Sequence, residues 1–199
     1  MYSPALREGS GVEVVPIDSP ALGDRSYLAH DGSVALVVDP RRDIGRVPVR
    51  DGDVIKVSPA MSVRVLATPG HTFTHLSYVL LAAGHQHAVF SGGSLLYGST
   101  GRPDLLGKAH AGEPARAQYA SVRRLAAELP ADANVYPTHG FGSFCSATQA
   151  EGTSSTIGRE RAVNPVMTLE PGRALPNARR EVLHGTGPTA RTTAVSPTR

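Results

Sequence analysis

An α/β domain is the fold class that the sequence predicts. Short runs rich in β-branched residues are separated by Asp-Gly and Pro-Gly turns through the first half of the chain, as in paired strands. One longer segment in the second half repeats its apolar residues at helical spacing. Hydrophobic residues make up 40% and charged residues 19% of the 199, which is typical of a globular protein.

The expected strands come mostly in pairs. Strands at 26–30 and 33–38 should form a hairpin, because the Asp31-Gly32 dipeptide between them suits a tight turn. The run from Val34 to Val38 is apolar at every position, which predicts a strand buried on both faces. The other strands are expected at 12–17, 54–57, 62–67, 75–81, 87–91 and 134–136.

One long helix is expected from Glu113-Pro114 to Leu129-Pro130. Proline suits its first turn, an apolar stripe runs along it, and the second proline ends it. A short helix over 156–162 should close a domain that spans residues 1–171. Residues 172–199 lose all periodicity and are rich in Thr, Pro, Gly and Ala, so we predict a disordered tail.

Charge and cysteine content exclude several classes of protein. The net charge of +3 comes from the tail, which contains five arginines and one glutamate. This spacing is too dilute for a nucleic-acid footprint, so no nucleic-acid partner is expected. The single cysteine, Cys145, excludes an internal disulfide and a cysteine-rich zinc site. No apolar run is long enough for a membrane helix or an export signal, so we expect a cytoplasmic protein with no membrane partner.

Histidine is the residue type that points to chemistry. His71 and His139 each follow a predicted strand, and histidines on loops at strand ends can converge on one metal ion. Surface or capping roles would produce the same spacing, so both interpretations stay open on spacing alone. Gly84 places His85 in a turn, and neither a carboxylate nor a third histidine follows His85 and His87 to complete a metal site. His75 would align with His71 only on a helix, whereas its surroundings are strand-like.

Four motifs in order carry a resemblance to a known family. They are Thr68-Pro69-Gly70-His71-Thr72, then Phe90-Ser91-Gly92-Gly93-Ser94-Leu95-Leu96, then Gly101-Arg102-Pro103-Asp104, and last Tyr136-Pro137-Thr138-His139-Gly140. Over residues 12–165 the chain resembles the metallo-β-lactamase superfamily, in particular its glyoxalase II and persulfide dioxygenase branch. The resemblance implies an αββα sandwich of the metallo-β-lactamase type. It also implies that His71 and His139 are metal ligands, that the metal of intact relatives is zinc or iron, and that the substrate is a glutathione-type thiol.

The sequence departs from that family in its first half and at position 93. The signature His-x-His-x-Asp-His is absent from the whole chain, and only residues 40–47 stand where a helix and strand should carry it. A strand–helix–strand unit needs about 30 residues, so the fold is expected to be shortened there. Gly93 stands where the family usually has an aspartate ligand, and glycine offers no side-chain oxygen.

These departures predict impaired chemistry. In intact relatives the metal activates water against a thioester, or binds O2 and a persulfide. Two neutral imidazoles hold a divalent ion weakly, so we expect weak or absent metal and impaired or lost activity, and we assign no catalytic side chain. The alternative is a non-catalytic remnant that binds a small thiol or a protein.

Several other residues have candidate roles. Arg102 is the candidate substrate-binding residue, because a guanidinium pairs well with the carboxylates of glutathione. Asp39 and Asp104 are the nearest carboxylates by motif, but turn or ion-pair roles suit them better. Core packing suits Tyr97 and Cys145 better than a role in a pocket.

Overall fold

The computed structural model describes residues 11–19, 24–39, 48–102, 112–139 and 154–168 of the chain. The predicted tail at 172–199 and the shortened segment at 40–47 lie outside the described residues, as do Asp104 and Cys145. The division of the chain at residue 171 therefore stays a prediction.

The first part of the chain forms a three-stranded antiparallel sheet in the order β1-β2-β3. Its strands are β1 (Glu13–Ser19), β2 (Asp24–His30) and β3 (Ala35–Val38). The predicted turn between β2 and β3 is present, and Asp31 holds it because its carboxylate accepts hydrogen bonds from the backbone N–H groups of Ser33 and Val34.

A six-stranded sheet follows in the order β4-β5-β6-β7-β8-β9. Among the described strands only β7 and β8 pair in parallel, and the helix α1 (Gly112–Glu128) lies between these two strands in the sequence, as a parallel connection requires. The strands are β4 (Val54–Lys56), β5 (Met61–Ala67), β6 (Leu76–Ala82), β7 (His85–Gly92), β8 (Asn134–Pro137) and β9 (Ser155–Thr156).

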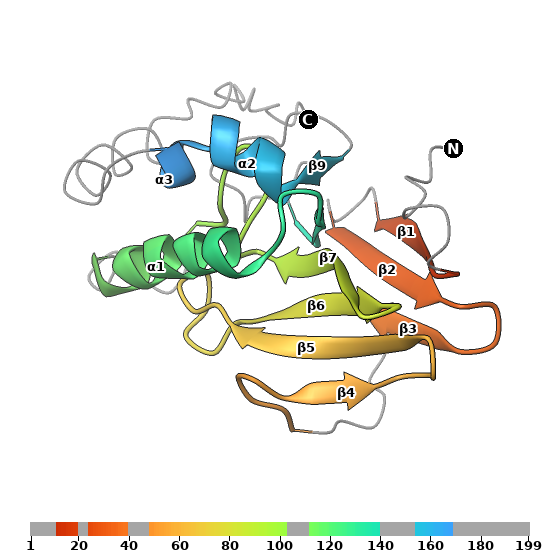
Figure 1. Ribbon diagram of the computed structural model, residues 1–199. Helices are drawn as coiled ribbons and strands as arrows, with labels where there is room; N and C mark the ends of the chain where they lie inside the picture. Colours follow the sequence, from red (N-terminus) through yellow and green to blue (C-terminus); the bar gives the residue numbers. More distant parts are fainter. Residues whose placement is uncertain (1–10, 20–23, 40–47, 103–111, 140–153, 169–199) are drawn as a thin grey trace, which may run out of the picture.

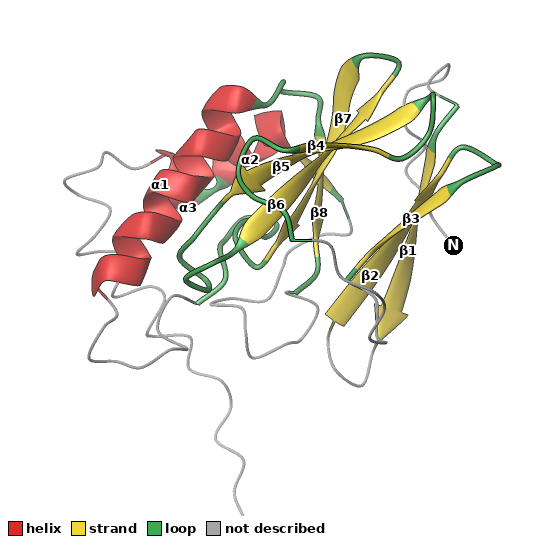
Figure 2. Cartoon of the chain, turned by 90° about the horizontal axis from the view of Figure 1, so that it is seen from below, coloured by secondary structure: helices red, strands yellow, loops and turns green. Residues whose placement is uncertain are grey.

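The described residues form three layers, a helical layer and two sheets (Figure 2). Helix α1 and the short helices α2 (Ile157–Val163) and α3 (Pro165–Thr168) lie on the outer side of the six-stranded sheet (Figure 1). Within the described ranges, no helix covers the outer face of the three-stranded sheet, so one helical layer of the αββα arrangement is not seen there. None of the helices in the described residues is long and apolar enough to cross a membrane.

Two apolar clusters hold these layers together. The first lies between the sheets, where Tyr27 of β2 packs against Phe90 and Tyr136 with ring centroids 5.5 and 5.0 Å apart. The second joins the six-stranded sheet to α1 and α2 through Val122, Leu125 and Ile157, all fully buried. The central strands of the six-stranded sheet therefore contribute to a core on each face, whereas the edge strand β4 is exposed.

The predicted burial of the β3 strand on both faces is wrong. Val34 and Val37 are 41% and 44% exposed, whereas Leu36 and Val38 pack against the core between the sheets. Within the described residues, one face of the three-stranded sheet packs on the core and no helix covers the other, so the side chains of this edge strand alternate between core and solvent. An uninterrupted apolar run does not distinguish this edge strand from a central one.

Candidate functional site

The candidate site lies at one edge of the six-stranded sheet, the edge formed by the ends of its strands and not by an outer strand. Strands β5, β7 and β8 run in the same direction and end at this edge, and β6 begins there. The loop from β5 to β6 carries His71, the end of β7 leads into Gly93, and β8 leads into His139. The sheet topology thus brings together three segments that are far apart in the sequence.

The two histidines proposed from the sequence are neighbours in the structure. Their ring centroids lie 5.4 Å apart, which is within the separation expected for two ligands of one site. His71 is 6% exposed. A third imidazole, that of His75, lies 6.2 Å from the ring of His71. The spacing of His71 and His75 predicts neighbouring rings only on a helix, whereas in the structure a loop brings the two rings together.

Asp24 fixes the orientation of His139. The Nδ1 atom of His139 lies 3.0 Å from a carboxylate oxygen of Asp24, at the start of β2. Because an ionised carboxylate only accepts hydrogen bonds, Nδ1 is the donor, and in the corresponding neutral tautomer Nε2 keeps its lone pair. The backbone N–H of Arg25 also donates to the carbonyl of Thr138 at 2.9 Å. The sequence contains no motif for Asp24, because this contact depends on how the two sheets pack.

His75 is a buried neutral histidine with both ring nitrogens engaged. Its Nε2 accepts a hydrogen bond from the backbone N–H of Gly93 at 3.3 Å, so its Nδ1 donates to Oγ1 of Thr68 at 2.9 Å. The Thr68 hydroxyl also meets that of Ser77 at 2.7 Å. Burial, with smaller contributions from the charges of His71 and His139, lowers the pKa of His75 to about 4. His75 therefore positions the Gly93 backbone and has no free lone pair for a metal.

His71 is held in a cradle of glycine backbone. A β-carbon on Gly93 would lie only 2.5 Å from Nε2 of His71, and one on Gly101 would lie 2.5 Å from its Nδ1. Nδ1 is buried and has no hydrogen-bond partner among the described residues. Burial and the electrostatic interaction with His139 lower the pKa of His71, and the backbone of Arg102 partly offsets this by raising it. The ring is thus kept neutral in a space that side chains at 93 and 101 would fill.

The donor set does not fit a catalytic zinc or iron centre. Within the described residues, no group of three or more His, Cys, Asp or Glu side chains is arranged to hold a metal ion. Of the three neighbouring imidazoles, that of His75 is committed to hydrogen bonds and that of His139 retains one donor nitrogen. Catalytic zinc sites generally use three protein ligands, and Gly93 supplies no oxygen. The ligand roles of His71 and His139 therefore stay predictions.

The remaining described candidates, Arg102, Tyr97 and Asp39, lie beside the site, in the core and in a turn, respectively. Arg102 lies beside the glycine cradle, next in sequence to Gly101, and its role toward a substrate stays a prediction. Tyr97 is 3% exposed and belongs to the core beneath α1, as expected from packing. Asp39 adopts a left-handed backbone conformation, with φ of 56°, and its carbonyl accepts a hydrogen bond from Ser26. This is the turn role that the sequence favours.

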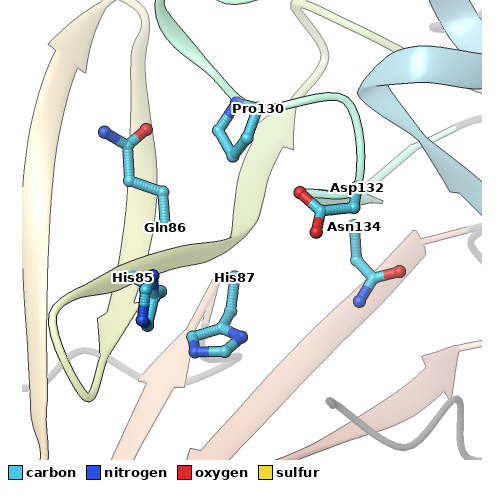
Figure 3. A pocket seen from close by; sticks show the side chains of 6 residues that line it. All are labelled: His85, Gln86, His87, Pro130, Asp132 and Asn134. Atoms are coloured by element: carbon cyan, nitrogen blue, oxygen red, sulfur yellow. The ribbon is translucent and has the colours of Figure 1, made fainter.

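The other histidine pair, His85 and His87, lies away from the candidate site, near the turn that joins β6 to β7. His85 is the first residue of β7 and follows the turn at Ala83-Gly84, so the expectation that it lies within the turn was off by one residue. The rings of His85 and His87 lie 6.2 Å apart beside a small hollow (Figure 3). The Nε2 atom of His87 hydrogen-bonds the carbonyl of Ala82 at 3.0 Å.

Comparison with curated proteins finds relatives that match part of the chain. A hydroxyacylglutathione hydrolase of Polaromonas sp. is 38% identical over 93 residues, which are 47% of this chain and 32% of the relative. One from Cupriavidus metallidurans is 36% identical over 147 residues, covering 73% of this chain and 47% of the relative. The human mitochondrial persulfide dioxygenase ETHE1 is 32% identical over 122 residues, covering 61% and 41%. The chain spans less than half the length of these relatives.

Comparison with solved structures shows the fold. A metallo-beta-lactamase from Staphylococcus aureus superposes with a TM-score of 0.71 at 21% identity, over 89% of this chain and 68% of that one. ETHE1 from Myxococcus xanthus superposes with a TM-score of 0.62 at 23% identity, over 86% and 88%. No protein-family model matches the chain. The structures confirm the expected α/β fold of the metallo-β-lactamase type, and the sequences confirm the likeness to glyoxalase II and ETHE1.

Proposed function

Because the chain has the metallo-β-lactamase fold and resembles glyoxalase II and ETHE1 in sequence, we propose that it is a protein of this branch with impaired or lost metal-dependent activity. Its ancestral reaction is hydrolysis of a glutathione thioester or oxygenation of a glutathione persulfide. In this chain His71 and His139 bind zinc or iron(II) weakly, and Arg102 meets a carboxylate of the glutathione-type ligand. The cytoplasm is the proposed location.

One observation carries the proposal. The two inherited histidines lie side by side, with ring centroids 5.4 Å apart, yet no third His, Cys, Asp or Glu among the described residues is placed to complete a metal site. His75 uses both ring nitrogens in hydrogen bonds, and position 93 has no side chain. A metal ion with two neutral ligands keeps most of its water and is poorly positioned against a substrate, so it does little to activate water.

Metal content and turnover of the purified chain test this proposal. We expect well below one zinc or iron per chain after dialysis against metal-free buffer, measured by elemental mass spectrometry. With added zinc or iron(II), hydrolysis of a hydroxyacylglutathione and O2 consumption with glutathione persulfide should stay near the rate without protein. A chain that retains one metal ion and turns over either substrate, with activity abolished by His71→Ala, would overturn the proposal.

A matched variant separates the weak site from the rest of the surface. Weak zinc binding by the wild type should decrease in His139→Ala and should not change in His87→Ala, because His87 lies in the other histidine pair. A competition titration with a chromogenic zinc chelator measures both. Equal loss in the two variants would show that zinc binds elsewhere. Retention of a glutathione analogue without turnover would favour the non-catalytic alternative.

A further inference from the structure

The position of His71 and the absence of a side chain at residue 93 depend on each other. We infer that the buried ring of His71, in its present position, and any side chain at position 93 exclude each other sterically. While the His71 ring packs against Gly93, the candidate site has no room for a carboxylate at position 93. The inference deepens the proposed function, because it gives a steric reason for the incomplete donor set. It rests on packing alone and does not require that His71 binds metal.

The backbone conformation of Gly93 would allow a side chain, but the space beside it is occupied by His71. Seven described glycines have a positive φ, which by itself disfavours a side chain, but Gly93 is not among them. An L-residue is therefore compatible with its backbone. A β-carbon there would nevertheless lie 2.5 Å from Nε2 and 2.7 Å from Cγ of His71, and would also overlap its Cδ2 atom. Non-bonded carbon atoms pack best about 3.5–4.0 Å apart, so the ring would have to move.

His71 has little freedom to move away. Gly101 closes the opposite side of the ring, where a β-carbon would also lie 2.5 Å from Nδ1. The N–H of Gly101 donates to the carbonyl of Gly93 at 2.8 Å, so the two walls of the cradle are hydrogen-bonded to each other. The ring is 6% exposed, and a shift toward either wall meets backbone rather than a flexible side chain.

The loop that carries His71 is also fixed. The Ser121 hydroxyl of α1 donates to the carbonyl of Pro69 at 2.7 Å, and the N–H of Thr68 donates to the carbonyl of His75 at 2.9 Å. A β-carbon on Gly70 would lie 2.5 Å from the backbone nitrogen of Gln118, so the loop packs directly against α1. Relief of a clash at position 93 would therefore disturb the loop, the helix contact or both.

A double-mutant cycle on thermal stability tests the inference. Gly93→Ala adds only the β-carbon, and we expect it to lower the Tm by about 5 °C or more, in the range of overpacking effects. In a His71→Ala background the same change should cost less than about 2 °C, because the smaller side chain frees the space. All measurements are made with EDTA, so they do not depend on metal binding, and a failure here is distinct from a failure of the proposed function.

Gly112 provides the matched control. Its φ is not positive and a β-carbon there would meet nothing within 4 Å, so Gly112→Ala should change the Tm by less than about 2 °C in both backgrounds. An equal cost of Gly93→Ala in both backgrounds, or no cost in either, would overturn the inference. If Gly93→Ala alone yields no soluble protein, recovery of soluble protein in the double variant supports it and continued insolubility overturns it.

Discussion

Asp24 at the start of β2 accepts a hydrogen bond from Nδ1 of His139 at 3.0 Å, so a residue of one sheet orients a candidate site residue that follows a strand of the other. Carboxylates commonly hold a histidine in this way and thereby select its tautomer. The site is consequently not a property of the six-stranded sheet alone. It needs the three-stranded sheet in its place.

We expect Asp24→Ala to change the tautomer of His139. In the neutral ring of the wild type the proton should reside on Nδ1, and in the variant the usual preference of a histidine side chain for the Nε2–H tautomer should return. Long-range ¹H–¹⁵N NMR of the ring nitrogens measures this directly. Asp18→Ala is the control, because Asp18 pairs with Arg25 and has no contact with His139. Identical ring shifts in the wild type and Asp24→Ala would contradict the assignment.

His75 should make the fold less stable at mildly acidic pH. Its pKa is about 4 in the folded protein and near 6.5 in the unfolded chain, so the unfolded chain binds more protons between these values. The contribution of His75 to the free energy of unfolding should therefore be fully present above pH 6.5, fall as the pH drops toward 4, and change little below that. The loss from this group is at most about 3 kcal/mol. Urea titrations across this range measure the slope, which His75→Gln should reduce. A flat profile for the wild type would contradict it.

The Glu160 carboxylate should be a major contributor to the stability of the second half of the chain. Glu160 is 1% exposed and its carboxylate accepts hydrogen bonds from Gly98, Asn164 and Ser155. The bond from Gly98 joins α2 to the turn at Tyr97-Gly98. Glu160→Ala leaves the buried Ser155 hydroxyl without this acceptor and leaves Asn164 with only the Ser99 carbonyl, so we expect a loss of about 2 kcal/mol or more in urea unfolding. Glu128→Ala, which removes partly exposed ion pairs with Arg64 and Arg124, should cost less than about 1 kcal/mol. Equal losses would contradict this.

Restoring the metal centre should need more than one substitution. Gly93→Asp adds one ligand to two and, by the packing argument, displaces His71, so zinc affinity should rise little. Insertion of a relative's His-x-His-x-Asp-His segment between Asp39 and Pro48 should raise zinc affinity far more, because it supplies several donors at once. Chelator competition measures both variants. A large gain from Gly93→Asp alone would show that the donor set lacks only that oxygen.

Removal of residues 172–199 should leave the Tm within about 2 °C of the full chain. Their composition offers little apolar surface to offset the entropy of ordering. Differential scanning calorimetry of the two chain lengths checks this. A drop of several degrees would show that the segment packs against the domain.

The elements were predictable because their boundaries are local. Turn residues such as Asp31-Gly32 and helix-ending residues such as Pro130 mark the ends of strands and helices, and the structure confirms these elements. The position of β3 at a sheet edge was not predictable, because the run from Val34 to Val38 is apolar throughout and edge position depends on pairing.

The candidate site was predictable only in part. His71 and His139 were found because motifs after strand ends indicate a shared edge. Asp24 was missed, since its contact with His139 comes from the packing of the two sheets, which leaves no local pattern. The commitment of His75 to two hydrogen bonds was missed for the same reason, because the distance between His75 and Gly93 depends on the β6–β7 register.

The contacts between the sheets at this edge have a consequence for breathing motions. The Tyr27 hydroxyl donates to the carbonyl of Pro137 at 2.6 Å, and Arg25 and Asp24 bind the two residues that follow. Any separation of the sheets here would release His139 before β8 itself unfolds. Hydrogen exchange at the Arg25 amide would then report the rate at which the sandwich opens, and the environment of the His139 ring would change with the same kinetics.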